Sequence, residues 1–141
     1  MVRTLLVACS LVLLPWAAGA ECSPDDLIGT WMLRGEGQAS PPSGSPSLCA
    51  ASARARFTAD GQVRFSKIVT GCAEGNPTTV SASGTWTLDD RFCLGEVNVT
   101  DSLGYTIPFF SVLVLDQGRE LRALEQHRLQ KAVYRWVGQR Q

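Results

Sequence analysis

Apolar and polar side chains alternate along much of this chain with the period of two that is typical of β-strands with one buried face. The segments 53–58 and 63–66 both place alanine, valine or phenylalanine on one face. The opposite face carries the basic residues Arg54, Arg56 and Arg64. Because antiparallel sheets commonly expose one face to water, we expect this arginine stripe to be solvated. With the two faces inverted, the stripe would instead line an anion-binding interior.

The residues between these two segments determine the strand register. A two-residue turn would pair Phe57 with Arg64 and mix the two faces. A three-residue loop over 59–61 pairs Phe57 with Val63 instead. It also puts Gly61 at the left-handed position of the bulge that such loops contain. The same reasoning predicts three-residue loops at 89–91 and 116–118, with the pairs Leu88–Phe92, Trp86–Leu94, Leu113–Leu121 and Ser111–Ala123.

The other elements follow from composition and turn signals. A short helical turn begins at Ser23, where a capping serine, a proline and two aspartates come together, and a first strand follows over about 28–33. Residues 35–47 are rich in glycine, serine and proline, which predicts a long loop. Residues 105–115 are apolar on both faces, so this strand should be deeply covered or line a hydrophobic interior. Within it, Pro108 requires an edge, a bulge or a bend.

A last strand is expected over about 129–137, which brings the number of predicted strands to eight. Most of them are joined by short turns, as in a chain that runs up and down around a closed sheet. The predicted fold is therefore all-β: a single antiparallel up-and-down eight-stranded barrel, preceded by the short helical turn.

Residues 1–20 have the features of a secretory signal peptide. A basic residue precedes an apolar run over 5–14, and Ala18-Gly19-Ala20 supplies the small residues of a cleavage site. The run is shorter than the roughly 20 apolar residues that cross a bilayer, which argues against a membrane anchor. A lipidation motif ending at Cys9 would leave the signal almost no apolar core. We therefore predict an exported mature domain over 21–141, periplasmic or secreted, with no membrane span.

The mature domain is nearly neutral. Of the 13 basic and 13 acidic side chains in the chain, only Arg3 lies in the predicted signal, so the domain has a net charge of −1. Without a basic excess, nucleic acid is not an expected partner. The one histidine, His127, falls in a predicted polar turn over 125–128, and no nucleophile elbow, phosphate loop or metal-binding helix motif is present. We expect no catalytic site, no cofactor and no metal site.

Four cysteines remain after cleavage, and an even number in an exported chain favours two disulfides over free thiols. Zinc is the alternative, but zinc sites use close pairs of ligands and these cysteines are each more than 20 residues apart. In an up-and-down barrel, Cys49 and Cys72 fall at one end, and Cys22 and Cys93 at the other. The ends are about 20 Å apart, and a disulfide needs Cα atoms within about 7 Å. The predicted disulfides are therefore Cys22–Cys93 and Cys49–Cys72.

Gly29-Thr30-Trp31 opens the first strand after the helical turn, and Arg135 lies on the last strand. This arrangement resembles the lipocalin and calycin architecture, especially the small exported bacterial lipocalin-like domains. In that family, the tryptophan of the Gly-x-Trp motif packs across the closed end of the barrel, beneath an arginine from the end of the chain. The resemblance implies a structural role for Gly29, Trp31 and Arg135 and a barrel that can enclose a cavity. It implies no particular substrate.

Three functions remain open. The favoured one is an exported binding protein that carries or senses a small apolar molecule inside the barrel. The second is a protein-binding module, such as an inhibitor of a secreted enzyme, for which an exposed apolar patch on the 35–47 loop would be the sign. The third is a structural envelope domain with a filled core. The volume of the barrel interior distinguishes the first function from the third.

Overall fold

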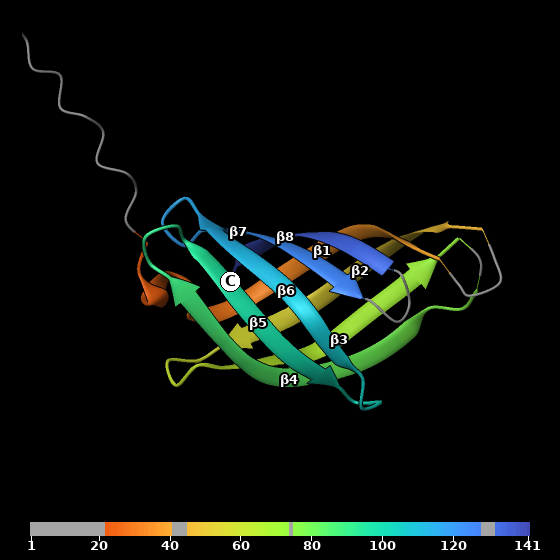
Figure 1. Ribbon diagram of the computed structural model, residues 1–141, viewed down its shortest axis with the longest axis horizontal. Coiled ribbons are helices and arrows are strands. Elements are labelled where there is room, and N and C mark those ends of the chain that lie inside the picture. Colours follow the sequence, from red (N-terminus) through yellow and green to blue (C-terminus); the bar gives the residue numbers. More distant parts are fainter. Residues whose placement is uncertain (1–21, 41–44, 74, 128–131) are drawn as a thin grey trace, which may run out of the picture.

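The computed structural model describes residues 22–40, 45–73, 75–127 and 132–141, so the predicted signal peptide lies outside the described residues. The elements are η1 (Pro24–Asp26), β1 (Gly29–Ala39), β2 (Ser47–Phe57), β3 (Gln62–Cys72), β4 (Thr78–Asp89), β5 (Leu94–Asp101), β6 (Thr106–Leu115), β7 (Glu120–His127) and β8 (Ala132–Arg140). Each strand pairs antiparallel with its neighbours in sequence, and β8 pairs with β1 to close the sheet (Figure 1). The predicted eight-stranded up-and-down barrel is confirmed.

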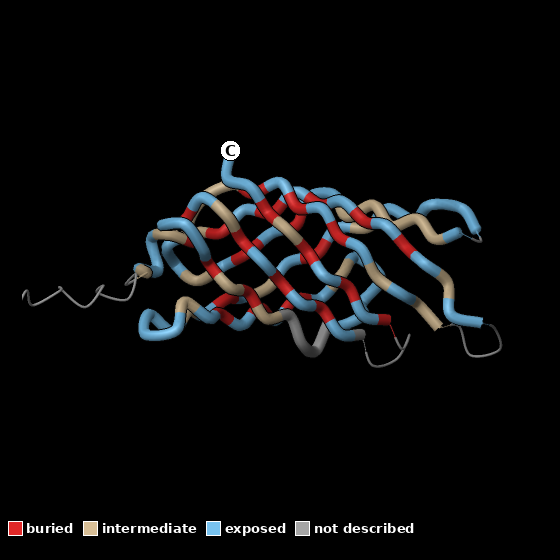
Figure 2. The backbone as a smooth tube through the Cα atoms, turned by 90° about the horizontal axis from the view of Figure 1, so that it is seen from above, coloured by how far each residue is buried: buried red, intermediate tan, exposed pale blue. Residues whose placement is uncertain are grey.

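Buried and exposed residues alternate along the strands as they cross the barrel (Figure 2). In β2 the buried inward positions hold Cys49, then alanine from Ala51 to Ala55, and then Phe57, which is 1% exposed. The outward positions hold the predicted arginine stripe, and its members are all exposed: Arg54, Arg56 and Arg64. The prediction of a solvated stripe is confirmed, and the interpretation as an anion-binding interior is wrong.

The β2–β3 hairpin has the predicted register. Phe57 lies opposite Val63, and the three-residue loop ends at Gly61, whose φ is 77°. A left-handed backbone at this position suits glycine, because a side chain there would be strained. Thr58 N donates a hydrogen bond to Gln62 O at 2.9 Å and closes the loop.

The other two predicted loops are each one residue too short. Val114 lies opposite Leu121, and Leu113 lies opposite Arg122. A slip of one residue would send every side chain of the strand to the wrong face, so the apolar pairing of Val114 with Leu121 determines the register. Likewise Leu88 lies opposite Gly95 rather than Phe92, which is 71% exposed. The remaining predicted pairs are replaced by Trp86–Val97 and Ser111–Leu124.

The segment 35–47 is not one long loop, because β1 continues to Ala39 and pairs with both β2 and β8. Gly35 and Gly37 occupy inward positions of this extension. An added Cβ on Gly35 would lie 2.8 Å from the ring of Trp136, and one on Gly37 would lie 2.6 Å from the ring of Tyr134. These glycines therefore accommodate aromatic side chains of the neighbouring strand, and do not form a turn.

The strand predicted over 105–115 is present as β6. The register with β5 shifts between Val97 and Val99, opposite the segment that contains Pro108. Such a shift agrees with one of the three alternatives expected for the proline, which were an edge, a bulge and a bend. Val112 and Val114 are buried, whereas the side chains at 107–110 lie outside the described residues. The last strand, β8, begins and ends three residues later than predicted.

The helical turn η1 closes one end of the barrel. Ser23 caps it: the side chain of Ser23 accepts from Asp25 N at 3.2 Å, and Asp26 accepts from Ser23 N at 2.8 Å. Trp31 is fully buried, and its Nε1 donates to Leu27 O at 2.8 Å. The indole thus fills the end of the barrel and also satisfies a carbonyl at the end of η1.

Arg140, and not Arg135, lies over Trp31. Its Cζ is 5.9 Å from the centre of the indole ring, within cation–π range, and its guanidinium donates to the carbonyl oxygens of Asp25 and Ile28. The β1–β8 register places Arg140 opposite Trp31, whereas Arg135 lies opposite Glu36 on the outer face. Arg135 was the wrong choice because side chains alternate between the two faces of β8, and Arg135 lies an odd number of residues from those that point inward.

The two cysteine pairs fit the predicted connectivity. Cys22 and Cys93 are bonded, with Cα atoms 5.5 Å apart, and attach the residues before η1 to the β4–β5 turn. Cys49 and Cys72 are bonded directly across β2 and β3, with Cα atoms 4.0 Å apart. One disulfide therefore stabilises each end of the barrel.

We expect Trp31→Ala to reduce the free energy of unfolding by about 3–5 kcal/mol, the usual cost of emptying a core aromatic site. Met32→Ala is the matched control, because the neighbouring Met32 points outward and is 43% exposed. That control should change stability by no more than about 0.5 kcal/mol. Urea unfolding of the three proteins measures both values, and equal midpoints for Trp31→Ala and the unmutated protein would contradict the assignment.

Candidate functional site

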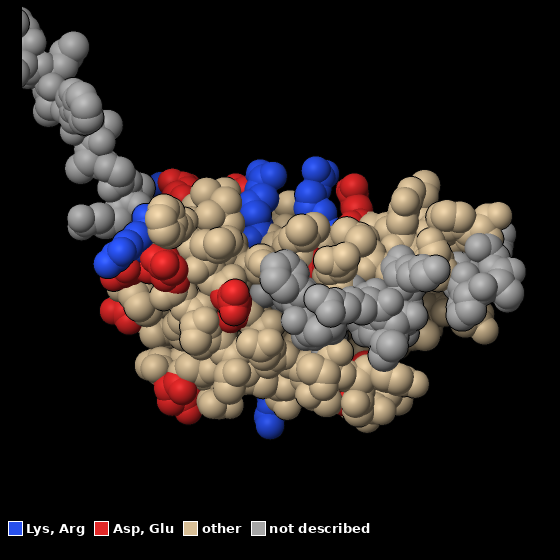
Figure 3. All heavy atoms as spheres, in the orientation of Figure 1, with Lys and Arg blue, Asp and Glu red and all other residues tan. Residues whose placement is uncertain are grey.

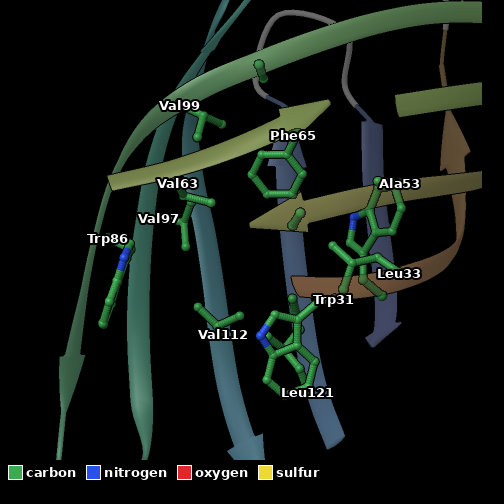
Figure 4. Packing of buried hydrophobic residues seen from close by; sticks show 14 of the residues in the cluster. Trp31, Leu33, Ala53, Val63, Phe65, Trp86, Val97, Val99, Val112 and Leu121 are labelled. Carbon is green, nitrogen blue, oxygen red and sulfur yellow. The ribbon is translucent and has the colours of Figure 1, made fainter. Parts of the chain in front are cut away.

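The barrel interior is filled at the η1 end and hollow at the other. Trp31 and Leu121 pack together at the filled end, and Phe65 and Val99 lie further along the barrel (Figure 4). A cavity of about 210 Å³ occupies the opposite end. Part of its apolar wall comes from β2, β3, β4 and β5 and consists of Ala53, Phe65, Ile68, Val80 and Val99.

A buried carboxyl group belongs to the wall of this cavity. Glu125 of β7 is 8% exposed, and its Oε2 accepts a hydrogen bond from Trp136 Nε1 at 2.9 Å. Burial raises the pKa of Glu125, and the indole hydrogen bond only partly opposes that rise. Tyr134 lies directly opposite Glu125 on β8, and its pKa is raised by burial and then by the negative charge of Glu125. These surroundings therefore destabilise the ionised carboxylate.

The glycines of β1 determine where the two aromatic rings lie. Gly35 is opposite Trp136, and Gly37 is opposite Tyr134. Because neither glycine has a Cβ, the rings lie against the β1 backbone, with their centroids 6.1 Å apart and their planes at 37°. This packing holds the indole so that its N–H reaches Glu125 across the β7–β8 pair.

The β5–β6 turn supplies the remaining polar lining of the cavity. Asp101 Oδ1 accepts hydrogen bonds from Leu103 N and Tyr105 N, both at 2.9 Å. These bonds hold Leu103 and Tyr105 at the cavity, although both side chains are also exposed to solvent. The charged residues among those that line the cavity are Asp101 and Glu125, both acidic.

The structural residues expected from sequence lie away from this cavity. Gly29 and Trp31 are at the η1 end, and Arg135 is on the outer face. Sequence reasoning missed Glu125 because it assigned the residue to a polar turn, whereas β7 continues to His127. The alternation in β7 could have identified it. Leu121 and Ala123 point inward, and Glu125 is the next inward position because every second residue of a strand faces the same side.

Most of the surface on the face shown in Figure 3 is uncharged, with basic and acidic side chains interspersed. In the part of the chain that the structure describes, no helix is long and apolar enough to cross a membrane. Among the same residues, no group of three or more histidine, cysteine, aspartate or glutamate side chains could hold a metal ion.

No family model and no curated protein matches the sequence. A de novo designed fluorescence-activating β-barrel matches with a TM-score of 0.48 and 11% identity over 83% of this chain and 95% of its own. A redesigned β-barrel matches with a TM-score of 0.47 and 18% identity over 83% of this chain and 93% of its own.

Glu125→Gln should stabilise the empty barrel, and the gain should grow with pH. The pKa of Glu125 is raised in the folded protein. The protonated carboxyl group therefore contributes its full share of folding stability below the ordinary pKa of 4.5, and this contribution is lost as the pH rises through the pKa of the folded protein. Each unit of that rise corresponds to about 1.4 kcal/mol. Glutamine keeps an oxygen that can accept the indole hydrogen bond but carries no charge.

Urea unfolding between about pH 4 and about pH 8 measures this gain. Glu96→Gln is the control, because Glu96 is exposed on the outer face of β5. If the difference in stability between Glu125→Gln and the unmutated protein is the same at every pH, Glu125 is not in a desolvated site.

Gly35→Ala should reduce stability by about 1–3 kcal/mol, the usual cost of overpacking. The new Cβ would lie 2.8 Å from the Trp136 ring, so the tryptophan fluorescence should change as well. Gly71→Ala is the control, because the nearest atom to a Cβ there, in Pro77, is 3.8 Å away. Equal stabilities for the two variants, measured by urea unfolding, would mean that Gly35 does not hold Trp136 in place.

Proposed function

We propose that this protein is an exported, lipocalin-like carrier or sensor of a small apolar ligand, which it holds in the cavity opposite η1. The observation that carries the proposal is the change from a filled to a hollow interior along one barrel. A cavity of about 210 Å³ lies beside a core that is otherwise filled with buried side chains. Because protein interiors are normally packed to crystal-like density, a void of this size favours a binding role over a filled structural core.

The size of the cavity limits the ligand. An apolar cavity of about 150 Å³ can hold benzene, so a cavity of about 210 Å³ suits one aromatic ring with a short substituent, or an aliphatic molecule of that size. Long fatty acyl chains and molecules with three or more fused rings exceed this volume. The ligand class is therefore a compact apolar molecule.

The architecture of the closed end supports the lipocalin-like assignment. Gly29-Thr30-Trp31 follows η1 directly, Trp31 fills the end of the barrel, and Arg140 from the last strand lies over the indole. These are the relations expected of that family, with Arg140 in the role first assigned to Arg135.

Export is supported by the two disulfides together with the sequence features of residues 1–20. Disulfides form and persist mainly in oxidising compartments such as the periplasm and the extracellular space. With Cys22–Cys93 and Cys49–Cys72 bonded, each end of the barrel depends on such a compartment for its cross-link. The mature protein is proposed to begin next to residue 21.

Binding of indole, a neutral molecule of suitable size, tests the proposed function. Excess indole should raise the melting temperature of the unmutated protein, because a ligand that binds only the folded state stabilises it by about 2.7 kcal/mol at 100 times its dissociation constant. Ala53→Leu should abolish the shift, since Ala53 lines the cavity and its enlargement fills space there. Ser52→Leu adds the same side chain on the outer face and should leave the shift intact.

The same three proteins, purified from their own host, can be compared by native mass spectrometry. The unmutated protein and Ser52→Leu should retain a small added mass that Ala53→Leu lacks. A bare mass for the unmutated protein, together with no stabilisation by indole, would contradict a ligand-binding function.

A further inference from the structure

We propose that the ligand carries a protonated amine, and that Glu125 is the counter-ion that holds it in the cavity. This inference rests on the proposed ligand-binding function and names the chemical class of the ligand. It follows from three observations: the position of a buried carboxyl group, the lack of a cation to pair with it in the described part of the cavity lining, and the aromatic surface beside it.

A buried carboxylate normally needs a partner of opposite charge, because desolvation of an isolated ion is expensive. Glu125 is more than nine-tenths buried and receives a hydrogen bond from the neutral indole of Trp136. Among the described residues, the ion pairs are Arg119–Asp116 and Arg122–Glu120, both on the surface. No described side chain therefore neutralises Glu125, and a cationic ligand would do so.

None of the described groups around Glu125 carries a positive charge. Tyr134 faces it from β8, and Asp101 and Tyr105 line the same cavity at the β5–β6 turn. From β1, the neighbours of the two aromatic rings are the side-chain-free positions Gly35 and Gly37. Among the described residues of the lining, those from β2 to β4 carry no charge, and none from any element is basic.

The distribution of arginine reinforces this conclusion. Arg54, Arg56 and Arg64 all lie on the outer face of the barrel wall whose inner face forms part of the cavity. A site for a carboxylate or phosphate ligand would be expected to direct at least one such group inward. With two carboxyl groups and no cation among the lining residues that the structure describes, an anionic ligand would be repelled.

The aromatic pair beside Glu125 is a second feature that suits an amine. The rings of Tyr134 and Trp136 lie side by side and both line the cavity. An ammonium group is attracted to the negative face of such rings, with tryptophan the strongest of them. A neutral hydroxyl group could also donate to Glu125, but it would gain neither the charge–charge nor the cation–π contribution.

Three probes of similar size test the amine: 2-phenylethylamine, 2-phenylethanol and phenylacetate. In calorimetric titrations near neutral pH, we expect the amine to bind at least about tenfold more tightly than the alcohol, the factor that separates charge-assisted from neutral hydrogen bonds. Phenylacetate should bind more weakly than either. The advantage of the amine should decrease as pH falls and Glu125 becomes protonated, while binding of the alcohol stays unchanged.

Glu125→Gln should remove the advantage of the amine and leave the affinity for the alcohol within about threefold, the ordinary variation between contexts for one hydrogen bond. Glu96→Gln, on the outer face, should leave both affinities unchanged. If the amine and the alcohol bind equally, and Glu125→Gln changes neither, the amine assignment is wrong while the ligand-binding function stands. If none of these probes binds and indole gives no stabilisation, the ligand-binding function fails, and the amine assignment fails with it.

Discussion

The inner face of β1 changes from large side chains to none along its length, and the rest of the barrel depends on this gradient. Trp31 and Leu33 fill the interior near η1, whereas Gly35 and Gly37 contribute no side chain to it further along. Because β1 pairs with both β2 and β8, it is also the strand that closes the sheet. One strand thus provides the side chains that fill one end of the barrel and the space for a site at the other.

The space left by the glycines is only partly empty, and what occupies it gives the site its chemistry. The rings of Trp136 and Tyr134 lie over the β1 backbone, and the indole N–H reaches the carboxyl group of Glu125. A buried carboxyl group with a raised pKa costs stability that an apolar side chain of similar size would not. Such departures from a stable core are expected at functional sites, where binding of a ligand offsets the cost.

The architecture of this barrel is predictable from sequence because each relevant signal is local and strong. Alternation over 53–66, the 59–61 loop and the spacing of the cysteines all follow from one physical rule, the two-residue repeat of a strand with a buried face. Once the strands run up and down, the distance between the two ends of the barrel restricts which cysteines can meet.

The site is harder to predict, because it is built from residues whose usual meaning is different. Gly35 and Gly37 resemble a loop in composition, and their true role depends on aromatic side chains about 100 residues later in the chain. Glu125 lies among polar residues that suggest a turn. Only the alternation of inward and outward side chains along β7 identifies it as buried. The assignment of Arg135 to Trp31 failed for a similar reason. The arginine that meets Trp31 is Arg140, and its identity depends on the β1–β8 register, which no local signal in the sequence reports.

The most direct test of this account is the pKa of the Glu125 carboxyl group, measured by carbon-13 NMR titration with and without saturating 2-phenylethylamine. In the empty barrel we expect a pKa above the ordinary value of 4.5, because the carboxyl group is buried. The bound ammonium group should lower it, because a nearby positive charge favours the carboxylate. An ordinary pKa in the empty barrel that does not change with the amine would contradict both the buried carboxyl group and its proposed role as a counter-ion.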